Sequence, residues 1–320
     1  MSVFDPFDSF SDIEDILFKL EDDDPGIRQV GVMELAETAS EDAIPHIIKA
    51  LSDQSEDVRL QAARVLQEFD GEVVSSGLTV ALQDPSDIVS AAAADSLAEL
   101  KEVEAARPLL PLTTHDKPFV RANALRALKG LRHPDSLKPA LAALQDPEPN
   151  VRMQAVGVLG YLQMEEALHA LILAGRDADI EVRRAAVGAL AYSSSNTVPA
   201  ALIRALSDNA WRVREISAET IGKIACSEGT DALMLVTEDE YWQVRLQSIR
   251  SLGKLGVARA IPAIVGALEH SISNLRKDAA AALGEIADAG ALPYLEKALG
   301  DPDPEVRKNA RWAIGRIEAA

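Results

Sequence analysis

The sequence contains little cysteine and few aromatic side chains, and each scarcity excludes a class of protein. Its single cysteine, Cys226, cannot form an internal disulfide and cannot by itself hold a zinc ion or an iron–sulfur cluster. This favours a reducing compartment, and we expect a cytoplasmic protein. Aromatic residues make up 4% of the chain, whereas hydrophobic residues of all kinds make up 48%. The core must therefore be built mainly from aliphatic side chains.

Basic charge and long apolar runs are also scarce. The chain has 32 lysines and arginines against 51 aspartates and glutamates, and its formal net charge is −19. Such a charge repels phosphate groups, so we expect the protein to bind neither nucleic acid nor anionic membrane surfaces. The sequence has no apolar run of about eighteen residues, and its start lacks the basic and apolar regions of a signal peptide. We therefore predict no membrane segment.

The sequence does contain a repeat with a period of 31 residues. An aliphatic residue followed by arginine recurs in register, with a small residue four positions after the aliphatic one and another aliphatic residue eight positions after it. The pairs are Ile27-Arg28, Val58-Arg59, Val120-Arg121, Val151-Arg152, Val182-Arg183, Val213-Arg214, Val244-Arg245, Leu275-Arg276 and Val306-Arg307, and Val89-Ser90 holds the same place without arginine. A repeat of this length decides the fold class before any single helix is assigned.

The pattern predicts two helices in each repeat. The recurring aliphatic residue and the positions four and eight after it lie on one face of a helix, which we name helix B. An aspartate five residues before it, such as Asp53 or Asp146, is suited to capping helix B. Another apolar stretch, such as 44–51 or 291–299, predicts a helix A before each turn. We expect residues 10–320 to form one continuous solenoid, preceded by an acidic and aromatic segment, residues 1–9.

The segment DPEPNVRMQAVGVLG, residues 146–160, resembles a HEAT repeat, and the short period resembles the subclass named after phycobilisome lyases. The resemblance covers residues 10–318. It implies an all-α fold, namely a right-handed α-solenoid of about ten 31-residue two-helix HEAT-like repeats, with the B helices on its concave face. It also implies that the recurring aspartates and arginines form a structural ladder between repeats, so that Arg28, Arg59 and Arg152 are not a binding patch.

Catalytic and metal-binding patterns find little support in the sequence. His115 and His270 hold the same place in repeats far apart in the chain, and we interpret them as turn residues that replace a capping aspartate. Cys226 has no histidine near it in sequence, which predicts an unreactive thiol. The His-Glu dipeptides of HEAT-like iron hydroxylases and the glycine-rich phosphate loops do not occur. We expect a protein that is not an enzyme and that needs neither metal nor cofactor.

The scarce aromatic side chains nonetheless gather at repeat positions that face away from the core. Tryptophan, tyrosine, methionine and arginine are enriched at recognition hot spots, and residues 119–254 carry equal numbers of acidic and basic side chains. We predict a partner-binding groove along the B helices, lined by Phe119, Arg126, Met153, Tyr161, Arg184, Tyr192, Trp211, Trp242 and Arg250. The alternative for the two tryptophans is that they wedge between layers as packing. The alternative for the two tyrosines is a packing role near the helix end.

Three functions fit this interpretation. The leading one is a non-enzymatic protein-interaction scaffold, an adaptor or maturation chaperone, that binds a partner protein in the groove and is a monomer or part of a heteromeric complex. The second follows from the resemblance and is a lyase-like subunit that handles a bilin or another linear tetrapyrrole, held by aromatic and arginine side chains. The third is self-assembly through the solenoid ends, which the charged terminal segments disfavour. The sequence does not name the partner.

Overall fold

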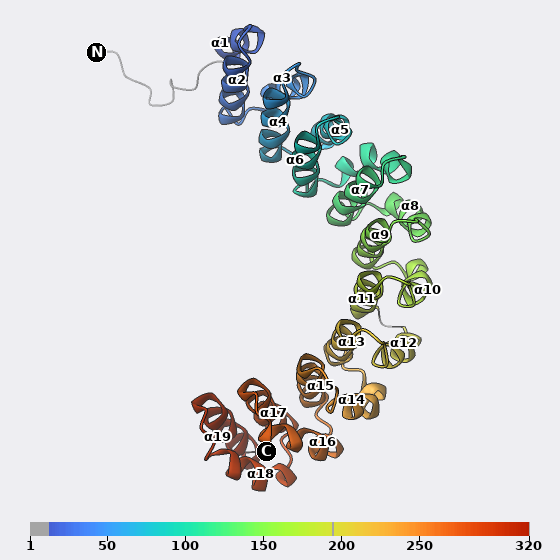
Figure 1. Cartoon of the computed structure of the whole chain (residues 1–320), viewed down its shortest axis with the longest axis vertical. Coiled ribbons are helices and arrows are strands. Elements are labelled where there is room, and N and C mark those ends of the chain that lie inside the picture. Colours follow the sequence, from blue (N-terminus) through green and yellow to red (C-terminus); the bar gives the residue numbers. More distant parts are fainter. Residues whose placement is uncertain (1–12, 194, 320) are drawn as a thin grey trace, which may run out of the picture. The chain divides into compact units, whose positions relative to one another are not determined.

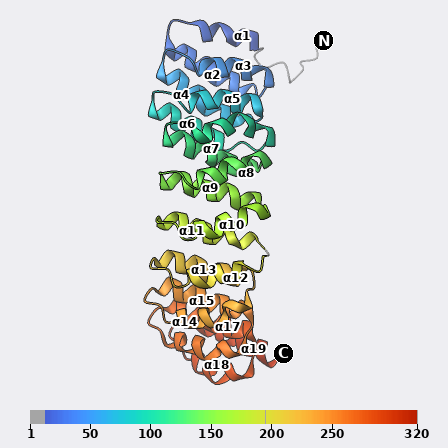
Figure 2. The same ribbon diagram turned by 90° about the vertical axis from the view of Figure 1, so that its right-hand side faces the viewer.

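The computed structural model describes residues 13–193 and 195–319, and the predicted N-terminal segment 1–9 lies outside this range. Every regular element of the described chain is a helix, which confirms the predicted all-α class. The chain divides into two compact units, residues 1–162 and 163–320, and we describe each by itself. Within each unit the B helices lie side by side in one layer and the A helices lie in a second layer (Figure 1, Figure 2).

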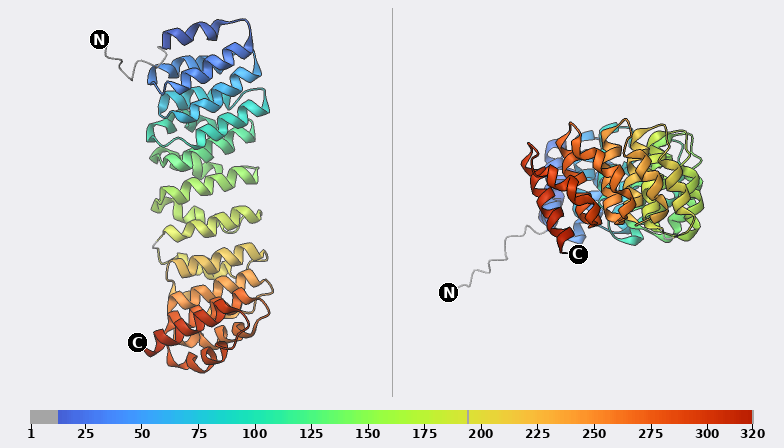
Figure 3. Two further views of the ribbon diagram at one scale, coloured as in Figure 1. Left: turned by 90° about the vertical axis from the view of Figure 1, so that its left-hand side faces the viewer. Right: turned by 90° about the horizontal axis from the view of Figure 1, so that it is seen from below.

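The B helices begin where the repeat predicts. Asp24, Asp179 and Asp303, each three residues before the repeat position, cap one of them by accepting a backbone N–H. The prediction that the aspartate five residues before that position is the cap is wrong, because Asp53, for example, accepts the N–H of Ser55 in the turn that precedes α4. Proline begins two others, α7 and α9, at a position where its missing N–H costs little. The left view of Figure 3 looks onto this layer. In unit 1 it contains α2 (Pro25–Glu37), α4 (Glu56–Val65), α6 (Asp87–Ala98), α7 (Pro118–Leu131) and α9 (Pro149–Leu162), and in unit 2 it contains α11 (Ile180–Ala189), α13 (Trp211–Lys223), α15 (Trp242–Leu255), α17 (Ser273–Ile286) and α19 (Pro304–Glu318).

The A helices are shorter, and one of them departs from the predicted α-helix. The A element before α7 is a 3-10 helix, η4 (Val103–Thr114), which contains Pro108 and Pro111. Each proline lacks an N–H and collides with the preceding turn of an α-helix, so the tighter helix forms instead. The other A elements are α1 (Ile13–Leu17) with η1 (Phe18–Glu21), α3 (Ile44–Ala50), α5 (Glu72–Ala81) and α8 (Leu137–Ala143) in unit 1, and α10 (Glu165–Ala174), α12 (Val198–Ala205), α14 (Thr230–Val236), α16 (Ile261–Val265) and α18 (Leu292–Ala298) in unit 2.

The core follows the predicted register of the B helices. On α13 the three repeat positions are Val213, Ser217 and Ile221, and all three are buried. The Ser217 hydroxyl donates to the carbonyl of Leu202 over 2.6 Å, which ties α13 to the A helix of its own repeat. Neighbouring B helices approach so closely that a Cβ added to Gly253 would lie 2.8 Å from the Cα of Ala282. Small residues therefore set the distance between neighbouring B helices.

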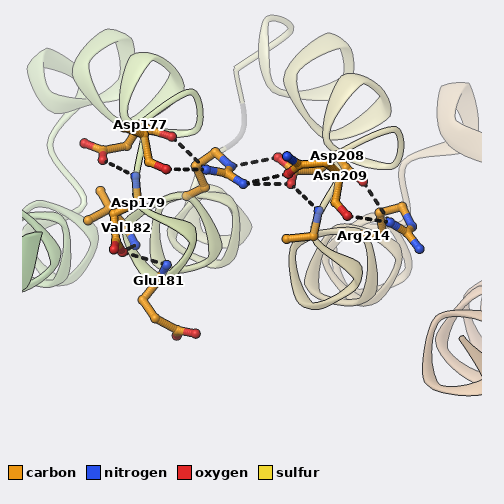
Figure 4. A network of polar contacts seen from close by, with 10 residues as sticks. Asp177, Asp179, Glu181, Val182, Asp208, Asn209 and Arg214 are labelled. Carbon is orange, nitrogen blue, oxygen red and sulfur yellow. Dashed lines mark hydrogen bonds and ion pairs between the residues drawn. The ribbon is translucent and has the colours of Figure 1, made fainter.

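The recurring arginines and aspartates form the predicted ladder between successive repeats. Nε and Nη2 of Arg214 donate to the two carboxylate oxygens of Asp239 over 2.6 and 2.8 Å, while Nη1 donates to two carbonyls of the loop before α13. The paired geometry of these planar groups gives strong, directed hydrogen bonds. Figure 4 shows the network around Asp208 and Arg214. Steps with this geometry join Arg28 to Asp53, Arg59 to Asp84, Arg121 to Asp146, Arg183 to Asp208, Arg214 to Asp239 and Arg276 to Asp301.

Each ladder aspartate has a second role in its own turn. Asp239, for example, accepts the backbone N–H of Tyr241 over 2.9 Å, just before α15 begins. Burial by itself would raise the pKa of Asp239, but the hydrogen bonds from Arg214 and from the Tyr241 N–H outweigh it and lower that pKa. The ladder thus keeps its carboxylates charged and fixes successive repeats to one another. It also occupies Arg28 and Arg59, which confirms that these two arginines are structural.

Candidate functional site

The four candidate residues of unit 1 lie on the B layer but at different heights. Phe119 is exposed at the start of α7, and Tyr161 is exposed near the end of the neighbouring helix α9. Because the B helices run in the same direction, these two rings lie at opposite edges of the layer. Met153 is half-buried between the two edges. Arg126 donates to Asp95 on α6 over 3.0 Å, and is therefore partly neutralised.

Tyr161 has two cations against its ring. Lys129 Nζ lies 5.7 Å from the ring centroid, and the guanidinium carbon of Arg132 lies 5.3 Å from it. Both contacts come from the end of α7 and the residue after it, so the tyrosine also serves to join two repeats. The alternative interpretation of this tyrosine as a packing residue near the helix end agrees with that geometry, although the ring itself remains exposed.

In unit 2 the two candidate tryptophans lie at one edge of the B layer, together with a tyrosine that the sequence analysis did not select. Trp211 and Trp242 begin α13 and α15, and the ring of Tyr241 stacks on that of Trp211 with a centroid distance of 5.5 Å and an interplanar angle of 15°. Trp242 is 37% exposed and Tyr241 is 39% exposed. Ile180, at the start of the adjacent helix α11, continues the apolar surface. We call Ile180, Trp211, Tyr241 and Trp242 the aromatic edge.

Arginine side chains hold the aromatic edge in place. Arg212 lies 5.5 Å from the Trp211 ring and Arg214 lies 5.7 Å from the Tyr241 ring, both within the range of cation–π attraction. Arg212 also reaches Glu181 on α11 over 3.4 Å. The stacking of Trp211 on a residue of the next repeat agrees in part with the packing alternative. The same contact fixes both rings without burying Tyr241, so the edge is preformed and exposed.

The remaining candidates of unit 2 are engaged with neighbouring side chains. Arg184 binds Glu181 over 2.7 Å, and Arg250 binds Asp278 of the next B helix over 3.1 Å. Tyr192 is exposed, and Lys223 Nζ lies 4.5 Å from its ring centroid. The pairs of Arg250 and Tyr192 lie towards the middle or the far end of their helices, away from the aromatic edge, whereas Arg184 and Glu181 lie near the start of α11, beside Ile180. The two arginines are thus less available to a partner than their exposed repeat positions suggested.

Two of the histidines and the cysteine occupy structural positions. Nδ1 of His115 accepts the Lys117 N–H and Nδ1 of His270 accepts the Ile272 N–H, each over 3.0 Å, which confirms that both are turn residues that replace an aspartate, although the aspartate they replace is not the cap of the helix. Cys226 is buried in a turn, and this burial raises the pKa of its thiol. No group of three or more histidine, cysteine, aspartate or glutamate side chains in residues 13–193 and 195–319 is arranged to hold a metal ion.

Two further observations concern the surface. A cavity of about 610 Å³ in unit 1 lies between the first two repeats, beside Arg28, His46 and Lys49, and is separate from the predicted groove. The aromatic edge is open surface, which suits a macromolecular partner better than a small enclosed ligand. No helix within the described ranges has the length and the apolar composition needed to cross a bilayer.

Comparison with known structures places the chain among solved solenoids. An engineered protein is 22% identical, with 96% of this chain covering 99% of that chain at a TM-score of 0.51. YibA of Escherichia coli is 20% identical, and the match covers 91% of this chain and 97% of that chain at a TM-score of 0.55. Kap95p, in a structure with RanGDP, is 18% identical, and 96% of this chain covers 50% of that chain at a TM-score of 0.64. At these identities the likeness shows the fold alone.

Sequence comparison identifies the repeat itself. The sequence has no match among the curated proteins. The family described as HEAT repeats matches residues 13–98, 44–119, 106–175, 169–235 and 230–315, which together span most of the chain. The narrower likeness to phycobilisome-lyase repeats is not confirmed by these matches. The chain belongs to the family of proteins built from HEAT repeats.

Proposed function

We propose that this protein is a non-enzymatic interaction scaffold, an adaptor or maturation chaperone, that binds a partner protein on the B-helix side of unit 2. The HEAT-repeat fold is typical of protein-interaction scaffolds, and rigid repeats lose little entropy on binding. A cytoplasmic setting is part of the proposal, supported by the single buried cysteine.

The aromatic edge is the observation that carries the proposal. Trp211, Tyr241 and Trp242 are large side chains with few rotatable bonds, and their stacking and cation–π contacts hold them in place before any partner arrives. Residues of this kind supply most of the binding energy at protein interfaces. Their positions at the starts of adjacent B helices place them in a row that an extended segment of a partner could follow. Kap121p, whose structure is similar in fold to this chain, is solved in complex with the extreme C-terminus of the protein phosphatase Cdc14p.

A pull-down from native lysate tests this assignment. The variant Trp211→Ala/Trp242→Ala removes both tryptophans of the edge, and Tyr294→Ala, an exposed aromatic on helix α18 of the other layer, is the matched control. We expect a protein that is retained by the wild type and by Tyr294→Ala and lost with the edge variant, after circular dichroism shows equal helix content. Equal retention by all three proteins would refute the assignment. A bilin that quenches Trp211 and Trp242 fluorescence would instead support the tetrapyrrole alternative.

A further inference from the structure

The arginine–aspartate ladder has two positions at which the aspartate is replaced by histidine, and they differ in one respect. At His115 the arginine of the preceding repeat is also missing, because Ser90 stands in its place. At His270 the preceding arginine, Arg245, is retained. The first change removes both partners of a step, whereas the second removes only the carboxylate. Arg245 is therefore a ladder arginine whose expected acceptor is absent.

The turn around His270 is otherwise built like the other turns. The Ile272 N–H donates to Nδ1 of His270 over 3.0 Å, as the Ser55 N–H donates to Asp53 over 2.8 Å. Nη1 of Arg276 donates to the His270 carbonyl over 2.8 Å, the contact that each ladder arginine makes with its own loop. Because Nδ1 accepts a hydrogen bond from the Ile272 N–H, the neutral ring carries its own proton on Nε2 and offers no acceptor to a guanidinium.

The guanidinium of Arg245 is arranged differently from those of the complete steps. Its Nε, which elsewhere donates to the aspartate, donates to the backbone carbonyl of Asp239. The carboxylate of Asp239 pairs with Arg214 and makes neither a hydrogen bond nor an ion pair with Arg245, although the charge of Arg245 helps to lower the pKa of Asp239. Neither Nη1 nor Nη2 of Arg245 makes an ion pair or a hydrogen bond with the described part of the chain, and the side chain is only half-buried. Two donor groups of a fixed cation are left available.

Arg245 lies next to the aromatic edge. Residues three apart on a helix share one face, so Arg245 follows Trp242 by one turn of α15. Unit 2 also differs in charge from unit 1, since residues 163–320 carry 22 acidic and 18 basic side chains, whereas residues 1–162 carry 29 and 14. An acidic segment is thus repelled far less by unit 2 than by unit 1.

We propose that Arg245 binds the carboxylate of an aspartate or glutamate in an extended segment of the partner protein. The partner then supplies the acceptor that His270 lacks, while its neighbouring apolar side chains contact Trp242 and Tyr241. Carboxylate is the ligand because it fills the same place in six other steps of this ladder, where its two oxygens match the planar guanidinium. The inference rests on the proposed function, because the aromatic edge provides the rest of the contact.

The substitution His270→Asp tests the inference because it supplies the missing carboxylate from within the chain. The probe is sodium acetate, titrated at constant ionic strength against sodium chloride, and the readout is the Nε–H signal of Arg245 in nuclear magnetic resonance spectra. The signal of Arg214, which is already paired, is the internal control. We expect acetate to shift the Arg245 signal saturably in the wild type, by at least five times the shift of Arg214, and to have no such effect in His270→Asp.

Two results would overturn the inference: an Arg245 signal that responds to acetate no more than Arg214, or an equal response in the wild type and in His270→Asp. A stronger response to inorganic phosphate than to acetate would refute the carboxylate and assign the site to a phosphorylated residue. Acetate needs no contact with the aromatic edge, so this titration does not depend on the tryptophans. If the edge variant keeps its partner while His270→Asp loses the acetate response, the proposed function fails and the arginine site stands.

Discussion

Asp239→Asn removes the charge from one step of the ladder while keeping the size of the side chain. The substitution weakens the two hydrogen bonds from Arg214 and leaves that guanidinium with only the exposed carboxylate of Glu240, 3.8 Å from its Nη2, as a counterion. The side chains of Arg214 and Asp239 are 11% and 7% exposed, so both charges are largely removed from water. Loss of one partner of a buried pair costs about 3–5 kcal/mol. Because asparagine keeps one acceptor and Arg214 keeps its carbonyl contacts, we expect a loss of about 2–3 kcal/mol.

Urea unfolding followed by circular dichroism measures this loss. A stack of repeats need not unfold in one step, so hydrogen exchange of the α13 and α15 amides should locate the weakened junction. The matched control is Asp303→Asn. Asp303 caps α19 through the Glu305 N–H over 2.8 Å, and within the described ranges it makes no ion pair. Asparagine is an equally good cap, so the control should change stability by less than about 0.5 kcal/mol.

The reasoning fails if Asp239→Asn and Asp303→Asn lose similar amounts of stability. A difference below about 1 kcal/mol would mean that water and salt screen the ladder as they screen an exposed ion pair. Sodium chloride at about 1 M shortens the screening length to about 3 Å. The same conclusion would follow if this salt destabilised the wild type as much as the substitution does.

The pH, a glycine between two B helices and the buried cysteine give three further tests. Hydrogen bonds from arginine hold the pKa of Asp53 and of Asp301 below the ordinary value near 3.8. The stability that these carboxylates contribute is therefore complete above the ordinary pKa and is lost as the pH falls through the lowered pKa, so the urea midpoint should be steady from about pH 7 to 5 and fall below about pH 4. A flat profile down to about pH 2 would contradict this. Gly253→Ala brings a Cβ within 2.8 Å of Ala282 and should cost about 1–3 kcal/mol, whereas a neutral result would show that α15 and α17 can move apart. The buried thiol of Cys226, whose pKa burial raises, should react with iodoacetamide at about pH 7.5 at least a hundredfold more slowly in the native protein than in urea; equal rates would show that the turn opens.

The fold was predictable because the buried positions recur at the same spacing in each repeat. Val213, Ser217 and Ile221 are spaced for one helical face, and the structure buries all three. The 3-10 helix η4 was missed because its apolar residues fit the spacing of helix A. Pro108 and Pro111 were visible in the sequence, but how a segment with two interior prolines satisfies its backbone depends on the helices packed around it.

The candidate site was predictable only in part, because the repeat register gives the direction of a side chain and not its partners. Trp242 is exposed where the register places it, whereas Arg184 and Arg250, selected as available cations, are bound by Glu181 and Asp278. Tyr241 was missed because it lies just before α15 begins, outside the helical positions that were compared. Its stacking on Trp211 joins residues thirty positions apart, and only the packing of α13 against α15 brings them together.

The ladder also constrains how the gene for this chain can change in length. Arg214 pairs with Asp239, and six residues after that aspartate the next arginine, Arg245, begins the following step. Loss of residues 183–213 would join Val182 directly to Arg214, which would still find Asp239 in register. A deletion or duplication of any other length would leave an arginine without its carboxylate inside the stack. Unequal recombination that keeps every existing step of the ladder is therefore confined to whole 31-codon units.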